Sequence, residues 1–274
     1  MAVLAGSYTA AKIALLDLPV FGLLLVRMAV TALALGAYAH FAGLRLWQSR
    51  SSAGYLAAQT ALYVLSQVLL FTALIMTSAG RVAILFNMQP FFTLLLLPLL
   101  VPSERLTRRR WLGTAAAFVG VALVLAERGT SGGSLLGDLL VLVAALCWTA
   151  SIILNKRMPS DLSAVSVIFW TSVGSIPVYA LLTLLLEPGE AWRLTAPAAA
   201  SVLYLGAVSG AVGFALVIWL TRTYSASRVN VFVFLSPVFG VLIGWAALGE
   251  TVSALQALGA LAVAGGILMV TAER

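Results

Sequence analysis

In this chain of 274 residues, 62% are hydrophobic and only 9% are charged, whereas a soluble domain carries roughly 25% charged residues. A water-soluble fold is therefore excluded. The formal net charge of +7 comes from basic residues scattered through short segments between apolar runs. That pattern is typical of topogenic charge and not of a nucleic-acid-binding surface. With a single cysteine, Cys147, one chain cannot form a disulfide or a thiolate metal site.

The apolar runs predict ten transmembrane helices in an all-α integral membrane protein. A helix that crosses a hydrocarbon core of about 30 Å needs on the order of 20 residues, since each adds about 1.5 Å. The first run is short, because about 14 residues reach only about 21 Å. In chain order, the expected spans are residues 2–15, 20–42, 54–77, 82–101, 111–126, 136–154, 163–186, 197–221, 229–248 and 254–271.

The basic residues between the spans predict the orientation of the chain. With a cytoplasmic N-terminus, eleven Lys and Arg residues fall in inside loops or the C-terminal tail and three fall outside. Cytoplasmic loops are enriched in Lys and Arg. We therefore expect a multi-pass protein of the inner (plasma) membrane with both termini in the cytoplasm.

Internal similarity divides the chain into two halves, residues 1–127 and 136–274. Asp17-Leu18 recurs as Asp161-Leu162 at an offset of 144, and Ser78-Ala79-Gly80-Arg81 recurs as Ser225-Ala226-Ser227-Arg228 at an offset of 147. Near-constant offsets over a whole half predict two repeats of five helices each. Because five is odd, the second repeat must enter the membrane from the opposite side, as in the inverted repeats of secondary transporters.

Short motifs lie near the ends of several spans. They are Gly6-Ser7-Tyr8-Thr9-Ala10-Ala11-Lys12 with Leu18-Pro19 and Arg27, Gly137-Asp138, and Ser225-Ala226-Ser227-Arg228 leading to Pro237-Val238-Phe239 and Leu248-Gly249-Glu250. In these motifs the chain resembles the EamA family of the drug/metabolite transporter (DMT) superfamily, over nearly its full length. The first half departs from the pattern at Pro102-Ser103-Glu104, where the family has Leu-Gly-Glu. The resemblance implies a central cavity lined by helices 1, 3, 4, 6, 8 and 9, and export of small metabolites or amino acids.

The third span has four hydrogen-bonding side chains on one helical face. They are Gln59, Tyr63, Ser66 and Gln67, spaced i, i+4, i+7 and i+8. Polar groups facing lipid would be costly, so this face is expected to line a substrate cavity. Hydrogen bonds between helices, each worth about 0.6 kcal/mol, are the alternative. The equivalent face of the eighth span holds Gly206, Gly210 and Gly213, either the smooth wall of a pocket or a helix-packing seam.

Two prolines occupy equivalent places in the fourth and ninth spans. Pro90 and Pro237 lack an N–H, so each should break the helical ladder and act as a hinge beside the pathway. Polar residues flank both positions, and we expect them to bind substrate: Asn87, Gln89, Asn230 and Ser236. A kink with no role in binding is the alternative.

Other candidates for substrate binding lie in spans that the family resemblance assigns to the cavity. They are Ser7, Tyr8, Lys12, Trp148, Ser151 and Tyr204. Lys12 and Arg27 form a cationic pair toward the outer side that could attract a substrate carboxylate, although snorkelling to the membrane surface would explain both. No carboxylate lies at a span centre, so antiport through a midplane glutamate is not expected.

Together these features predict a secondary transporter that exports small metabolites or amino acids by alternating access. A channel-like permease or a lipid flippase is the alternative. No enzyme is expected, because the sequence has one His, no candidate Ser-His dyad with a second base and no HExxH motif. We expect no cofactor, no metal and no nucleic-acid partner. The small-residue faces of the fifth and tenth spans, at Gly113, Ala117, Gly120, Gly259, Ala262 and Gly266, suggest scaffold packing or a homodimer.

Overall fold

The computed structural model describes residues 2–44, 46, 52–100, 108–126, 134–155, 162–213 and 235–271. Every regular element in these ranges is helical, which confirms the all-α prediction. The elements are α1 (Ala2–Ala14), α2 (Val20–Phe41), α3 (Ala53–Met76), α4 (Ala79–Phe86), α5 (Gln89–Leu100), α6 (Arg108–Ala126), α7 (Leu135–Asn155), α8 (Ala164–Leu186), α9 (Ala196–Leu203), the π-helix η2 (Tyr204–Gly213), α12 (Leu235–Leu248) and α13 (Ala254–Thr271).

Five helical segments are long and apolar enough to cross a bilayer. They are α2, α3, α7, α8 and the continuous segment Ala196–Gly213, with mean hydropathies between 1.4 and 2.1. Shorter apolar helices lie within α6, α12 and α13. The lengths fit the roughly 20 residues that one crossing needs. The chain is therefore a multi-pass membrane protein.

Side-chain caps begin several of the spans where the sequence changes from polar to apolar. Ser78 accepts a hydrogen bond from the backbone N–H of Arg81 and so starts α4, and Ser163 starts α8 in the same way. Thr195 caps α9, where a proline occupies the first turn. Ser and Thr at these positions satisfy backbone N–H groups that have no partner within the helix.

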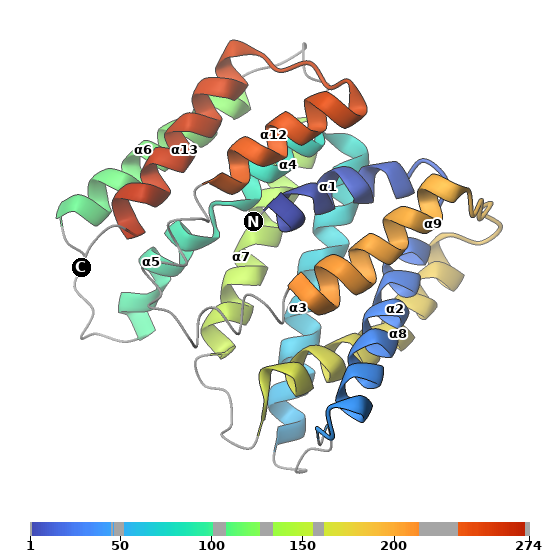
Figure 1. Cartoon of the computed structure of the whole chain (residues 1–274). Coiled ribbons are helices and arrows are strands. Elements are labelled where there is room, and N and C mark those ends of the chain that lie inside the picture. The colour runs from blue at the N-terminus through green and yellow to red at the C-terminus, as the bar shows by residue number, and fades with distance from the viewer. Residues whose placement is uncertain are drawn as a thin grey trace.

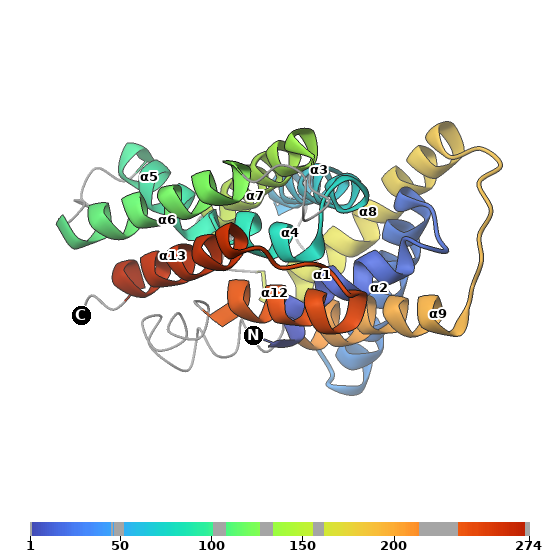
Figure 2. The ribbon, with the colours of Figure 1, turned by 90° about the horizontal axis from the view of Figure 1, so that it is seen from above.

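The helix contacts repeat when the two halves of the chain are exchanged. Three pairs join equivalent helices, α2 with α8, α4 with α12 and α6 with α13, and they lie side by side (Figures 1 and 2). The third span of each repeat packs on the first span of the other: α3 contacts α7, and α9 with η2 contacts α1. The fourth span of each repeat also packs on the first span of the other: α4 and α5 contact α7, and α12 contacts α1. This exchange symmetry is that of a pseudo-two-fold axis. With an odd number of spans in each half, the repeats have inverted topology.

Glycines bring the backbones of α6 and α13 into direct contact. A Cβ added to Gly120 would lie 2.7 Å from the backbone oxygen of Gly259, and one added to Gly266 would lie 2.5 Å from that of Gly113. Such close approach is the use of small residues in membrane helices. The two small-residue faces that suggested either a scaffold or a homodimer therefore cover each other within one chain.

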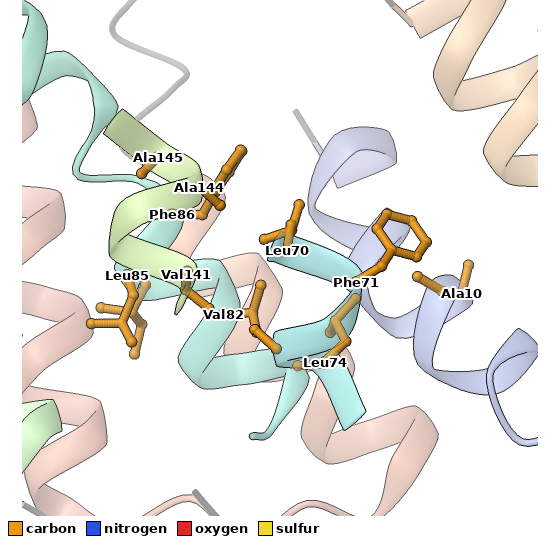
Figure 3. Close-up of a cluster of buried hydrophobic side chains, with 14 of the residues drawn as sticks. Ala10, Leu70, Phe71, Leu74, Val82, Leu85, Phe86, Val141, Ala144 and Ala145 are labelled. Carbon is orange, nitrogen blue, oxygen red and sulfur yellow. The ribbon is translucent and has the colours of Figure 1, made fainter. Parts of the chain in front are cut away.

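Apolar side chains fill the space where α1, α3, α4 and α7 meet. Figure 3 shows Leu70 and Leu74 of α3 beside Val82 of α4 and Val141 of α7, with the ring of Phe71 near Ala10 of α1. All of these side chains are buried. The core thus joins α1, α3 and α4 of the first repeat to α7, the first helix of the second repeat.

Two of the expected spans are irregular. The fourth span is broken, because α4 ends at Phe86 and α5 begins at Gln89. The eighth span changes from α-helix to π-helix at Tyr204, and π-helical turns are frequent at functional sites. Asn230 lies outside the described residues, as does Pro102-Ser103-Glu104.

Candidate substrate site

The break between α4 and α5 lies three residues before Pro90. Because proline has no N–H, the backbone oxygen of Phe86 cannot receive the usual helical bond. The chain instead turns at Asn87, whose backbone has φ −72° and ψ 8°, and Met88 bonds to the backbone oxygen of Leu85 at 3.1 Å. The side chain of Asn87 donates to the backbone oxygen of Ala83 at 2.6 Å. The predicted interruption is therefore present in α4–α5.

Four aromatic rings from four helices form a continuous row beside this break. Tyr8 of α1 stands edge-on to Phe86, the last residue of α4, with ring centroids 6.1 Å apart. Phe86 is also 6.1 Å from Trp148 of α7, which lies 5.8 Å from Tyr63 of α3. These separations are those of attractive aromatic pairs. The row brings together Tyr8, Tyr63 and Trp148, which lie 55 and 85 residues apart along the sequence.

The polar face of α3 is turned into the protein, as its spacing predicts. Gln59, Ser66 and Gln67 are buried. Gln59 donates from Nε2 to the hydroxyl of Ser151 on α7 at 2.6 Å, whereas its Oε1 is buried and has no partner in the described part of the chain. Exchanging the amide O and N would leave the nitrogen unpaired instead. One atom of this amide therefore needs a partner from elsewhere.

Two further polar contacts join the halves of the chain. The hydroxyl groups of Ser7 on α1 and Ser209 on η2 are 2.6 Å apart. Thr149 on α7 donates to the backbone oxygen of Gln89 at 3.3 Å, next to the break in the fourth span. Such bonds contribute little each in a membrane.

Arg27 is a buried cation on α2 that contacts α3. Its Nη1 donates to Oε1 of Gln67 at 2.8 Å, and its guanidinium carbon lies 5.3 Å from the centroid of the Phe71 ring. The side chain is 6% exposed, and Nε has no hydrogen-bond partner in the described residues. The sequence marked Arg27 as an intramembrane charge but gave no sign of these partners.

Lys12 belongs to a polar network at one end of the bundle. Its Nζ donates to the backbone oxygen of Thr77 at 2.8 Å and forms an ion pair with Glu250 at 3.3 Å. Glu250 in turn accepts the backbone N–H groups of Ala79 and Gly80 at 2.7 and 3.0 Å. An anion at a helix N-terminus is favourable because of the exposed N–H groups and the helix dipole. The network ties α1 and the segment after α12 to the start of α4.

The Leu248-Gly249-Glu250 motif has a clear structural role. Gly249 has φ +63°, in the left-handed region that favours glycine. This conformation turns the chain after α12, and the next residue, Glu250, then reaches the N-terminus of α4. The motif was visible in the sequence, but its acceptor role was not, because the donors lie 170 residues away.

A second buried ion pair lies beside this network. Arg81, in the first turn of α4, donates to Asp138 in the first turn of α7 through Nε at 3.2 Å and through an Nη group. Thr77 also donates to Asp138, at 2.9 Å. Both charged side chains are only 1% exposed. The pair links the fourth and sixth spans across the two halves.

The remaining candidates lie in packing positions or beyond the described side chains. A Cβ on Gly210 would lie 2.6 Å from the hydroxyl of Thr31, so this part of η2 packs closely on α2. The phenol of Tyr204 packs against Gly6 of α1. Ser236 and Pro237 lie in the first turn of α12, where the structure describes the backbone alone. The face of Gly206, Gly210 and Gly213 is therefore better explained as a helix-packing seam than as the wall of a pocket.

This helical architecture, with two repeats and a polar and aromatic cluster at their junction, defines the class of protein as a polytopic membrane transporter. The sequence model of the EamA-like transporter family matches residues 1–126 and 135–272. The chain therefore belongs to the EamA-like transporter family.

Similar proteins include transporters from several bacteria. A protein of Salmonella typhimurium named "Probable amino-acid metabolite efflux pump" is 31% identical over 199 residues, which cover 69% of this chain and 66% of that protein. The protein of that name from Escherichia coli is 30% identical over 200 residues, with the same coverage of both chains. The alignments thus span just under two thirds of each relative. A crystal structure has the same fold, with a TM-score of 0.70 over 99% of this chain and 94% of that chain, at 21% identity.

Proposed function

We propose that this transporter exports amino acids or small metabolites across the bacterial inner membrane by alternating access. The observation that carries the proposal is that polar side chains inside the membrane are paired between the two repeats: Ser7 with Ser209, and Gln59 with Ser151. A carrier that rocks one repeat against the other makes and breaks such contacts. The names of the two efflux-pump relatives support the substrate class.

In this proposal the substrate binds beside the aromatic row and the polar face of α3. Tyr8, Tyr63 and Trp148 provide ring faces, while Gln59 has an amide atom without a protein partner. The other expected contributors around this site are Ser7, Gln67, Asn87, Gln89, Ser151 and Tyr204, whereas Gly210 packs against Thr31 of α2. Binding sites of inverted-repeat transporters lie near the midplane at the junction of the repeats.

The broken fourth span supplies the proposed hinge. The turn at Asn87 and Met88, N-terminal to Pro90, lets α4 and α5 tilt separately, because few helical bonds cross it. Pro237, the equivalent proline, would serve the same role in the second repeat. Since the helices that move must remain attached to a fixed part, the tightly packed α6 and α13 are the proposed scaffold.

The distribution of basic residues supports an orientation with both termini in the cytoplasm. The network of Lys12, Glu250 and the N-terminus of α4 would then lie at the outer face. Its ion pair and helix-end bonds would hold that side closed. A homodimer would need a different surface from the glycine seam, because α6 and α13 cover each other there.

The test is export from bacterial cells that express the chain, with a panel of amino acids and small metabolites measured inside and outside by mass spectrometry. We expect selective depletion of one solute or solute class. The Gln59→Ala/Gln67→Ala variant should lose it while still reaching the membrane. Ser172→Ala is the control, because Ser172 is buried and, in the part of the chain that the structure describes, its hydroxyl bonds within α8 to Ile168. Unchanged levels of every solute would refute the proposal.

A second measurement separates a carrier from a channel or a lipid flippase. Proteoliposomes loaded with the exported solute should show flux that saturates and is accelerated by the same solute on the opposite side. A flux that rises in proportion to concentration would identify a pore. Movement of labelled lipid without solute flux would identify a flippase.

A further inference from the structure

Arg27 and Arg81 are both buried arginines, yet among the described residues only Arg81 has a carboxylate partner. Arg81 forms its ion pair with Asp138 inside the protein. Arg27, which is 6% exposed, makes no ion pair with any described residue. A charge within a membrane protein is costly unless a partner balances it. The position of Arg27 therefore calls for an anion.

The hydrogen bonds of the Arg27 guanidinium lead to the same requirement. A guanidinium has five N–H donors. In the described part of the chain its one hydrogen-bond acceptor is Oε1 of Gln67, and Nε is shielded without an acceptor. The Phe71 ring, 5.3 Å away, faces the cation from one side, but a phenyl ring has no lone pair that could accept a further hydrogen bond. Buried polar groups are nearly always hydrogen-bonded, so these N–H groups indicate a ligand that is absent from the chain itself.

The nearby acidic residues at this end of the bundle have other partners. Glu187 accepts the backbone N–H groups of Phe21 and Gly22 at the start of α2. Asp17 accepts a hydrogen bond from Thr195 at 2.5 Å, and Glu250 is paired with Lys12. None of these carboxylates is bonded to Arg27. An anion for Arg27 would therefore have to come from outside these residues.

Arg27 also lies next to the proposed pathway and not at its margin. Arg27 lies seven residues after Val20, the start of α2, which is about 10 Å along the helix. On the neighbouring helix α8, Tyr179 lies seven residues before the end at Leu186, which is the end that faces the start of α2. The phenol oxygen of Tyr179 is likewise buried and has no hydrogen-bond partner among the described residues. The hydrogen-bond partner of Arg27, Gln67, lies one helical turn from Tyr63 on the same face of α3. The cation thus borders the aromatic row assigned to the substrate.

We infer that Arg27 binds a carboxylate group of the transported solute, with Gln67 orienting the guanidinium. The inference rests on the transport function proposed above and specifies its substrate class: solutes with a free carboxylate, carried in preference to their neutral amides. A guanidinium is suited to this group, because its planar fork donates two parallel hydrogen bonds to the two carboxylate oxygens. A lysine at the same place would offer charge without the fork.

The test uses the full chain in proteoliposomes. One set is loaded with a mixture of natural amino acids and another with the corresponding amino-acid amides, and efflux is followed by mass spectrometry. Wild type should move at least one acid about tenfold or more faster than its amide, since hydrogen bonds between charged groups are strong. Arg27→Gln should abolish that preference by slowing the acid. Arg27→Lys should retain part of it.

Phe71→Leu separates ligand binding from packing, because it removes the ring beside Arg27 and leaves the charge. It should keep the acid-over-amide preference. Each variant is first checked for a single symmetric peak on size exclusion. Equal efflux of acids and amides by wild type, or an unchanged preference in a folded Arg27→Gln, would overturn the carboxylate inference and leave the transport proposal intact. No efflux of either set, in liposomes that contain folded wild type, would overturn the carboxylate inference together with the export of amino acids.

Discussion

Removing Asp138 should destabilise the protein strongly, because it removes the carboxylate that is paired with a buried arginine. The Asp138 carboxylate accepts from two nitrogen atoms of Arg81 and from the hydroxyl of Thr77. Both charged side chains are 1% exposed, so water cannot replace the lost partner. Breaking a buried pair of this kind costs about 3–5 kcal/mol. With about 2–4 °C per kcal/mol for a chain of roughly this size, Asp138→Ala should lower Tm by about 6–20 °C.

The assay is thermal denaturation of purified protein in a mild detergent, followed by the fraction that remains monodisperse. The double variant Arg81→Met/Asp138→Leu should recover most of the loss, because replacing both charges by apolar groups is often neutral. If Asp138→Ala melts within about 2 °C of wild type, the pair is not an energetic link between the fourth and sixth spans. A double variant less stable than Asp138→Ala would contradict the argument that the loss comes from removing one partner of a buried ion pair.

Three further predictions follow from particular contacts. Gly266→Ala should cost about 1–3 kcal/mol, because its Cβ would lie 2.5 Å from a backbone oxygen of α6 and overpacking forces backbone shifts; thermal denaturation measures it. Gln59→Leu should lower export while changing stability by only about 0.6 kcal/mol, the average value of one bond such as that to Ser151. Glu250→Gln should weaken the ion pair with Lys12 and so raise the labelling, by a membrane-impermeant thiol reagent, of a cysteine placed in the proposed pathway.

Each of these has its own control. Gly265→Ala lies on the same helix as Gly266 but faces open space, so equal losses of Tm in the two variants would argue against the backbone contact. For Gln59→Leu, full export at wild-type rate would remove this residue from the substrate site. For Glu250→Gln, the labelling is compared in a background that already lacks Cys147, and unchanged labelling would mean that this network does not hold one side closed.

The helices were predictable because their signals are local. Hydropathy and Ser or Thr caps depend on neighbouring residues, so the spans and many of their ends follow from the sequence. The interruption of the fourth span was predictable for the same reason, since Pro90 removes a donor wherever it lies. The change to π-helix at Tyr204 was not, because the glycines of this segment also allow an ordinary α-helix and its close packing on α2 is a tertiary feature.

The candidate site was predictable only in part. The spacing of Gln59 and Gln67 placed both on a buried face, and Tyr8, Tyr63 and Trp148 do come together. The sequence did not show that the Gly210 face packs on α2. It assigned Lys12 to substrate binding without showing its ion pair with Glu250, which lies 238 residues away. Side-chain identity alone does not reveal whether a polar group already has a partner.

By itself, the sequence determined that this chain is an all-α membrane transporter of two inverted repeats. Composition, periodicity and the repeat offset are properties of the chain that no packing can alter, and five spans per repeat require opposite orientations. Only the tertiary structure decided which intramembrane charges are balanced. Arg81 finds Asp138 and Arg27 finds no carboxylate among the described residues, because pairing depends on which helices meet. The difference between Arg81, which has a carboxylate partner in the chain, and Arg27, which is proposed to bind substrate, therefore arises from the packing of the two repeats.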